Sequence, residues 1–104
     1  MVTRETQTLG YPRIGRDREL KRAVERYWRG DADKAALMDT FWAVVKAGWR
    51  TQLEAGIDHI GVGSETLYDH VLDWAVRFGL VAAQVDHLNG LAHYFGMARG
   101  AEEA

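Results

Sequence analysis

One short segment of the chain brings together side chains that could transfer protons. It contains Tyr68, Asp69, His70 and Asp73. On a helix, Asp69 and Asp73 would share a face at spacing i and i+4, and His70 would neighbour Asp73 at i and i+3. A carboxylate beside an imidazole can fix its tautomer and favour a general acid or base role near neutral pH. The alternative is structural, with Asp69 capping a helix and His70 a buried, hydrogen-bonded residue.

A second group of candidates is basic and lies near the N-terminus. The group lies around a Gly/Pro turn and the predicted start of a helix, and consists of Arg13, Arg16, Arg18 and Lys21. These cations, with the free N–H groups of a helix start, could bind carboxylates or phosphates. Residues 1–29 carry eight Arg/Lys against four Asp/Glu, which suits an anionic ligand or an acidic partner. Alternatively, Arg18 and Lys21 are surface residues in salt bridges with Glu19 or Glu25.

Sequence patterns predict the elements that would position the basic group. Residues 9–14 are typical of an edge strand that runs into a turn, because they contain Pro12 and end before Gly15. A helix is predicted over residues 17–29, with Asp17 as its cap and Gly30 as its stop. A longer helix should then begin after Asp31 or Asp33 and end at Gly56.

The second half of the chain shows the same alternation of signals. Residues 57–62 predict a second strand because they are rich in β-branched residues. Thr66 and Asp69 predict a capping box for a third helix through Phe78, with Gly79 as its stop. One or two short helical segments follow over residues 82–98.

The aromatic residues lie at helical spacing and are expected to be mostly core. They are Trp28, Trp42, Trp49, Trp74, Tyr27, Phe41 and Phe78. Some of them could instead line a pocket for a flat ligand such as a pterin.

Four motifs occur in one order along the chain: the turn and basic helix start over residues 8–23, then residues 54–58, 68–73 and 94–100. Their sequences are TLGYPRIGRDRELKRA, EAGID, YDHVLD and YFGMARG. In order and spacing they resemble the N-terminal barrel of cobalamin-independent methionine synthase. The resemblance covers nearly the whole chain and implies a strongly truncated member of that family, with a methyltetrahydrofolate-type compound as the ligand it would bind.

The resemblance also implies roles for particular residues. The run Arg18-Glu19-Leu20-Lys21 matches an element that helps bind the polyglutamate-bearing folate in the family. Where the family usually has Asp-Phe-Ser-Trp, this chain has Ser64-Glu65-Thr66-Leu67, directly after the predicted second strand. Residues that follow strands form the functional face of a parallel α/β barrel, so Ser64 and Glu65 become candidates for a repurposed pocket. Relaxed selection would produce a similar change.

Length and composition exclude several functions. The 104 residues form one domain, 1–104, well short of the roughly 250 residues of a complete (β/α)8 barrel. There is no cysteine, no tight metal-ligand spacing and no nucleotide-binding motif, so no metal site is expected. No apolar run could span a bilayer and the basic cluster is short, so neither membrane nor nucleic acid is expected as a partner and a cytoplasmic location is the default. Met1 and the acidic end favour a natural stop.

The predicted fold is mainly α with two short strands, an α+β chain in the order β-α-α-β-α-α. The resemblance implies that this order is a portion of a (β/α) barrel whose two strands are parallel neighbours. Two parallel strands alone leave polar edges and apolar faces uncovered. We therefore expect the partial barrel to be completed by self-association, as a homodimer.

Three functions are compatible with the sequence. The first is a stand-alone domain that binds a folate-like or other anionic small molecule through Arg13, Arg18 and Lys21, without complete zinc-dependent methyl transfer. The second is a repurposed small enzyme of specialised metabolism that uses acid/base chemistry in an oligomeric pocket. Its catalytic groups would be Glu65, Tyr68, Asp69, His70 and Asp73. The third is an accessory protein that pairs with another chain.

Overall fold

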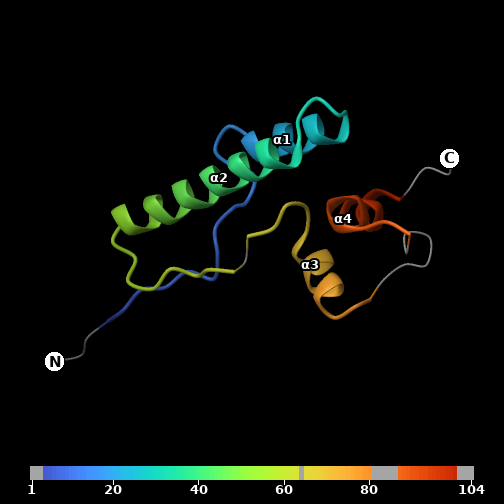
Figure 1. Ribbon diagram of the computed structural model, residues 1–104. Coiled ribbons are helices and arrows are strands. Elements are labelled where there is room, and N and C mark those ends of the chain that lie inside the picture. The colour runs from blue at the N-terminus through green and yellow to red at the C-terminus, as the bar shows by residue number, and fades with distance from the viewer. Residues whose placement is uncertain (1–3, 64, 81–86, 101–104) are drawn as a thin grey trace. The chain divides into compact units, whose positions relative to one another are not determined.

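The chain is mainly helical, as a computed structural model shows for residues 4–63, 65–80 and 87–100. Its contacts divide it into two compact units, Met1–Leu67 and Tyr68–Ala104. The first unit contains α1 (Glu19–Trp28) and α2 (Lys34–Glu54), and the second contains α3 (His70–Arg77) and α4 (Gly90–Arg99) (Figure 1). Of the segments predicted over residues 82–98, residues 82–86 lie outside the described part.

The start of α1 differs from the prediction. Arg18 is the N-cap residue and has a left-handed backbone, with φ of 61°. The Asp17 N–H donates to Glu19 Oε1 at 2.5 Å, so Glu19 folds back over the loop and Asp17 does not cap with its side chain. Gly15 has φ of 92°, a conformation that favours glycine, and a Cβ atom there would lie 2.7 Å from Glu19 Oε2, so the carboxylate would have to shift. The predicted stop is confirmed, because Gly30 follows α1 with φ of 79°.

Helix α2 begins and ends as its sequence predicts. Asp33 is the N-cap, and its Oδ1 accepts from the Ala36 N–H at 2.8 Å. Gly56, after the C-terminus, has φ of 83°. Helices α1 and α2 pack against each other, and their facing apolar residues form the core of this unit. The buried apolar residues of the two helices are Leu20, Val24, Leu37, Phe41 and Val45.

The two predicted strands are reduced to one contact. Within the described residues, the only β-pairing outside the helices is an isolated parallel bridge between Gln7 and His59. The Thr8 N–H donates to His59 O at 3.1 Å, and the His59 N–H donates to Thr6 O at 2.9 Å. The parallel direction is thus confirmed at this position, whereas the strand over residues 9–14 is wrong. Pairing occurs earlier in the chain, before Pro12 removes a donor.

The segment before the Gly/Pro turn is attached firmly to α2. Thr8 Oγ1 donates to Gln52 Oε1 at 2.5 Å, and Gln52 Nε2 donates to Gly48 O at 3.1 Å. Gln52 is buried. The Gly61 N–H donates to the same Thr8 hydroxyl at 3.3 Å, so the segment after His59 is held at this point as well. These bonds fix the backbone immediately before Tyr11.

The second unit is built on caps and one tyrosine. Asp69 is the N-cap of α3 and its Oδ2 accepts from the Leu72 N–H at 3.1 Å, so the predicted Thr66 cap is wrong and Asp69 caps instead. Gly79, with φ of 75°, ends the helix as predicted. The Tyr94 hydroxyl donates to Asp73 Oδ1 at 2.6 Å and accepts from the Tyr68 N–H at 3.0 Å. This hydroxyl links α4 to the start of α3.

The expectation of an aromatic core holds only in part. Phe41 is buried between the helices of the first unit, but Trp42 is exposed. On α3, Trp74 and Phe78 are 52% and 74% exposed, and their rings stack with centroids 5.8 Å apart. The spacing of the aromatic residues predicted the helices, but it did not predict which aromatic rings are buried.

Candidate functional site

The turn that follows Thr8 packs onto the middle of α2. The Tyr11 ring lies against Gly48, and a Cβ atom at Gly48 would be 2.8 Å from Tyr11 Cδ1. Glycine inside a helix costs roughly 1 kcal/mol relative to alanine. Here the missing side chain makes room for an aromatic ring, so the cost is offset by a close contact between the turn and the helix.

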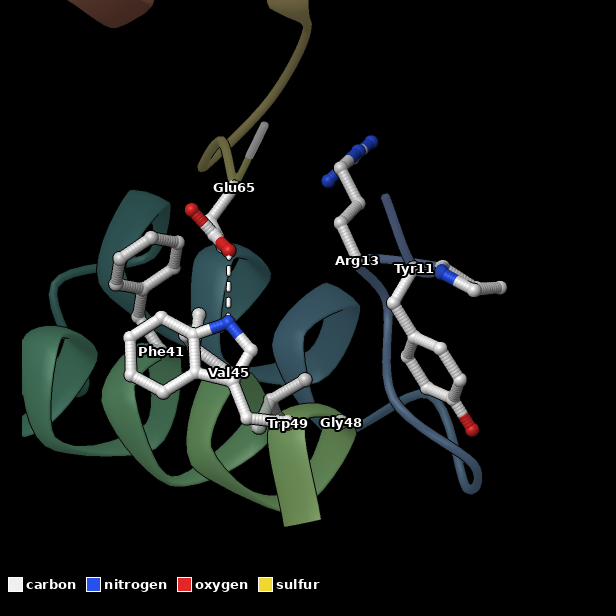
Figure 2. A pocket seen from close by; sticks show the side chains of 9 residues that line it. Tyr11, Arg13, Phe41, Val45, Gly48, Trp49 and Glu65 are labelled. Carbon is white, nitrogen blue, oxygen red and sulfur yellow. Dashed lines mark hydrogen bonds between the residues drawn. The ribbon is translucent and has the colours of Figure 1, made fainter. Parts of the chain in front are cut away.

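A small pocket lies on one side of this contact (Figure 2). Its volume of about 20 Å³ is enough for a single water molecule. Its walls come from the turn, from the apolar face of α2 and from the segment that follows the bridge residue His59. The lining residues are Tyr11, Pro12, Arg13, Phe41, Val44, Val45, Gly48, Trp49 and Glu65.

Glu65 and Trp49 form a polar pair at this pocket. The indole Nε1–H of Trp49 donates to Glu65 Oε1 at 3.1 Å, which Figure 2 marks with a dashed line. The other carboxylate oxygen accepts from the Gly63 N–H at 2.7 Å. Glu65 therefore holds the indole and its own loop in place. It belongs to the first unit, whereas the other four acid/base candidates belong to the second.

Arg13 reaches the same pocket from the opposite wall. Arg13 Nη1 donates to the Leu67 carbonyl at 3.2 Å, and its side chain extends away from the Tyr11 ring (Figure 2). The fold thus brings together Arg13 and Glu65, two candidates that are far apart in sequence. Arg13 is predicted to bind an anion, and Glu65 is predicted to take part in acid/base chemistry.

A much larger groove opens on the other side of the Tyr11–Gly48 contact. Its volume is about 520 Å³, within the roughly 300–1,000 Å³ typical of small-molecule sites. Tyr11, Pro12 and Val44 line both the groove and the small pocket. From the turn and the start of α1, the groove is lined by Tyr11, Pro12, Gly15, Arg16 and Glu19, and from α2 by Val44, Ala47 and Thr51. By size, the groove and not the pocket can accept an organic molecule.

The basic candidates have different environments. Arg16 lines the groove, and both Arg16 and Arg18 are exposed. Lys21 lies 3.7 Å from Glu25 in an exposed i, i+4 pair, as the structural alternative predicts. Such pairs contribute little to stability.

The two middle residues of the Arg-Glu-Leu-Lys match have structural roles. Leu20 is fully buried, so its side chain belongs to the core. Glu19 lines the groove but directs its carboxylate to the loop N–H of Asp17. Ser64 lies outside the described residues.

The acid/base cluster of the second unit is occupied by structural bonds. Asp69 caps α3, as one alternative predicted, and its Oδ1 lies 3.7 Å from His70 Nδ1. The His70 side chain is 77% exposed, so the buried histidine of that alternative is wrong. Asp73 accepts from the Tyr94 hydroxyl. The predicted spacing therefore does bring these residues close together, but Asp69 is used there as the N-cap of α3.

The described part of the chain has neither a metal-binding cluster nor a membrane-spanning helix. No cluster of three or more His, Cys, Asp or Glu residues suited to a metal ion occurs there. None of its helices has both the length and the apolar character needed to cross a membrane.

The chain belongs to the family of cobalamin-independent synthase N-terminal domains, which its residues 5–104 match. It is 54% identical over 101 residues to the 5-methyltetrahydropteroyltriglutamate-homocysteine methyltransferase of Synechococcus sp. (strain JA-2-3B'a(2-13)), a match that covers 97% of this chain and 13% of that protein. The enzymes of the same name from Thermosynechococcus vestitus and Trichodesmium erythraeum are 50% and 45% identical, over 95% and 91% of this chain. The chain spans 13% of the length of each of these relatives.

Sequence reasoning missed Tyr11, Gly48 and Thr51 as parts of a site. One signal was present, since an isolated glycine inside a helical pattern often has a packing or functional reason. The partner of that glycine, however, comes from a distant segment and has no local signature.

Proposed function

We propose that this methionine-synthase-like N-terminal domain binds a folate-like or other anionic small molecule in the groove between the 11–19 segment and α2. The relatives are named for 5-methyltetrahydropteroyltriglutamate, which combines a reduced pteroyl group with several carboxylates. One observation carries the proposal. The groove of about 520 Å³ has an aromatic wall at Tyr11 and a guanidinium at Arg16.

The charged residues that line the groove are Arg16 and Glu19, and Glu19 directs its carboxylate to the Asp17 N–H, which leaves Arg16 for an anionic ligand. Within the described residues no ion pair involves Arg16 or Arg18, so neither guanidinium is neutralised by a neighbouring carboxylate. Guanidinium groups bind carboxylates through two parallel hydrogen bonds. Outside the groove, Arg13 at the small pocket retains donors beyond the one used on Leu67, and Lys21 lies in the first turn of α1, where it is paired with Glu25.

The proposal covers binding and not complete methyl transfer. The matched segment is 13% of the length of the first relatives, and the sequence contains no cysteine to supply a thiolate zinc ligand. The role proposed for this segment is therefore to hold the folate-like ligand.

Affinity for 5-methyltetrahydropteroyltriglutamate, measured by calorimetry at low and high salt, tests the proposal. The variant Arg16→Ala/Arg18→Ala should bind about tenfold or more weakly, since hydrogen bonds to charged groups contribute roughly 1.5–3 kcal/mol. The salt dependence should fall with it. A matched control is Arg22→Ala/Arg26→Ala, which removes the same charge from exposed positions of α1. Equal affinity in wild type and both variants would contradict the proposal.

The acid/base alternative remains a prediction with less support. His70 is exposed, and Asp69 and Asp73 each accept a hydrogen bond within their own unit. These bonds do not exclude chemistry, but they give each carboxylate a structural role. Substrate turnover that disappears in a folded His70→Ala variant would favour this alternative over binding alone.

A further inference from the structure

We infer that Glu65 is a positioning residue for the groove, because it fixes the loop that holds Arg13 and, through Arg13, the turn that carries Arg16. The inference rests on the proposed function, since it concerns the same groove. It gives Glu65 a role that differs from the acid/base role predicted from the sequence, and it requires no contact between Glu65 and a ligand.

The carboxylate of Glu65 ties its loop to α2. Oε1 accepts from the Trp49 indole N–H at 3.1 Å, and Oε2 accepts from the Gly63 N–H at 2.7 Å. Trp49 lies on α2 one turn beyond Val45, which is buried in the core of this unit. Hydrogen bonds to a carboxylate are stronger than those to a neutral acceptor, so the two bonds hold the loop against a packed helix.

The same loop holds Arg13. Thr66, which follows Glu65, is only 4% exposed, so the chain stays packed beyond the carboxylate. The next carbonyl, that of Leu67, accepts from Arg13 Nη1 at 3.2 Å. Figure 2 shows Glu65 and Arg13 on opposite walls of the small pocket. The position of the Arg13 side chain therefore depends on a loop that Glu65 fixes two residues before the carbonyl.

Arg13 and Arg16 belong to one braced turn. Pro12 fixes a φ angle directly before Arg13. The Leu20 N–H donates to the Ile14 carbonyl at 3.0 Å, which joins the turn to the first residues of α1. A shift of Arg13 is therefore passed on to Arg16 at the groove.

Glu65 can affect binding only from a distance. The small pocket that it lines has a volume of about 20 Å³, room for one water molecule, and Glu65 does not line the groove. By charge alone, loss of this carboxylate would strengthen the binding of an anion, because a nearby negative charge repels it. A positioning role predicts the opposite sign, since a loosened turn has to be ordered again when a ligand binds.

Affinity for 5-methyltetrahydropteroyltriglutamate, measured by calorimetry, tests the inference. Glu65→Ala should bind about fivefold more weakly, and Glu65→Gln, which keeps an oxygen acceptor for the indole, should recover most of this loss. Trp49→Phe removes the same bond but keeps an aromatic ring, and it should weaken binding about threefold. The matched control is Glu54→Ala, which removes an exposed carboxylate from the end of α2 and should leave the affinity unchanged.

A double-mutant cycle tests the route through Arg13. Arg13→Ala should weaken binding at least as much as Glu65→Ala, and the double variant should bind no more weakly than Arg13→Ala. The indole N–H resonance of Trp49, identified by its loss in Trp49→Phe, gives a second readout. It should move in Glu65→Ala and stay in place in Arg13→Ala, because Arg13 lies beyond Glu65 on this route.

The outcomes separate this inference from the proposal beneath it. If wild type does not bind 5-methyltetrahydropteroyltriglutamate, both are overturned. If wild type binds it and Glu65→Ala binds as tightly or more tightly, the inference is overturned while the groove remains the site. Additive losses in the double variant, or an unmoved Trp49 resonance in Glu65→Ala, would overturn it as well. If Glu65→Ala does not fold, Trp49→Phe carries the test, and undiminished affinity in that variant overturns the inference.

Discussion

The two units of this chain use their charged side chains for different purposes. In the second unit, Asp69 caps α3 and Asp73 accepts from Tyr94, so both carboxylates serve the fold. In the first unit, Arg16 lines an open groove and takes part in none of the described ion pairs. The difference teaches that clustering of reactive side chains is a weak guide to function, and that the partners each group already has are a better one.

The units also differ in how their apolar residues are covered. Leu20 and Leu37 are fully buried where α1 meets α2, whereas α3 has no buried residue and exposes Trp74 and Phe78. The first unit therefore has a core of its own to hold a site in place. In the second unit, Phe95 of α4 is buried, and the capping bond of Asp69 and the Tyr94 hydroxyl add polar contacts.

The largest effect should come from the core of the first unit. Leu20→Ala should lower the free energy of unfolding by about 2–5 kcal/mol, because it leaves a cavity beneath α1. Urea unfolding followed by circular dichroism measures the change. Leu53→Ala, at a position that is 64% exposed, is the matched control and should change stability by less than about 0.5 kcal/mol. Equal losses in both variants would break the contrast between core and surface.

Self-association is the next effect in size. The exposed Trp74 on α3 and Phe78, the C-cap of that helix, stack on each other, and we expect the predicted homodimer to cover them. In the variant Trp74→Ser/Phe78→Ser the dimer dissociation constant should rise at least thirtyfold, or by roughly 2 kcal/mol. Analytical ultracentrifugation measures the shift. A wild-type chain that stays monomeric over the accessible concentrations would remove the dimer prediction.

The tyrosine bridge of the second unit gives a smaller effect. Tyr94→Phe removes a donor to Asp73 and an acceptor for the Tyr68 N–H, which should cost about 1.5 kcal/mol of stability. Thermal unfolding of the whole chain provides the measurement. Tyr11→Phe is a useful comparison, since no described hydrogen bond involves the Tyr11 hydroxyl, and it should leave the melting temperature unchanged.

The smallest effect separates capping from chemistry at Asp69. Asp69→Ala should cost about 1 kcal/mol, whereas Asp69→Asn should cost far less because asparagine is also a good N-cap. Denaturant unfolding of both variants gives the comparison. Equal destabilisation by asparagine and alanine would show that the charge of Asp69, and not its capping bond, is what the second unit needs.

Local signals in the sequence predicted local structure well. Asp33, Gly30, Gly56 and Gly79 occupy the caps and stops assigned to them, because each feature depends on a few neighbouring residues. At the start of α1 the prediction of Asp17 as the cap is wrong, because the N-cap residue is Arg18 and no side chain caps the helix. Glu19 reaches back over the loop in place of Asp17.

Contacts between residues far apart in the chain could not be predicted from the sequence. Pairing is confined to the Gln7–His59 bridge, next to which the Thr6 N–H donates to Asp58 Oδ2 at 2.9 Å and the Asp58 N–H donates to Thr6 Oγ1 at 3.1 Å. These side-chain bonds occupy backbone groups that a longer strand ladder would use. The Tyr11–Gly48 contact likewise joins segments whose meeting no local pattern specifies.

The bond between Thr8 and Gln52 has a consequence for the order of folding. It joins residues 44 positions apart, so a long loop must close before it can form, whereas α1 and α2 can form from neighbouring residues. The groove should therefore be completed late, when the N-terminal segment docks on helices that already exist. A ligand that binds this groove would recognise only the finished unit, and it would raise stability by slowing the release of that last segment.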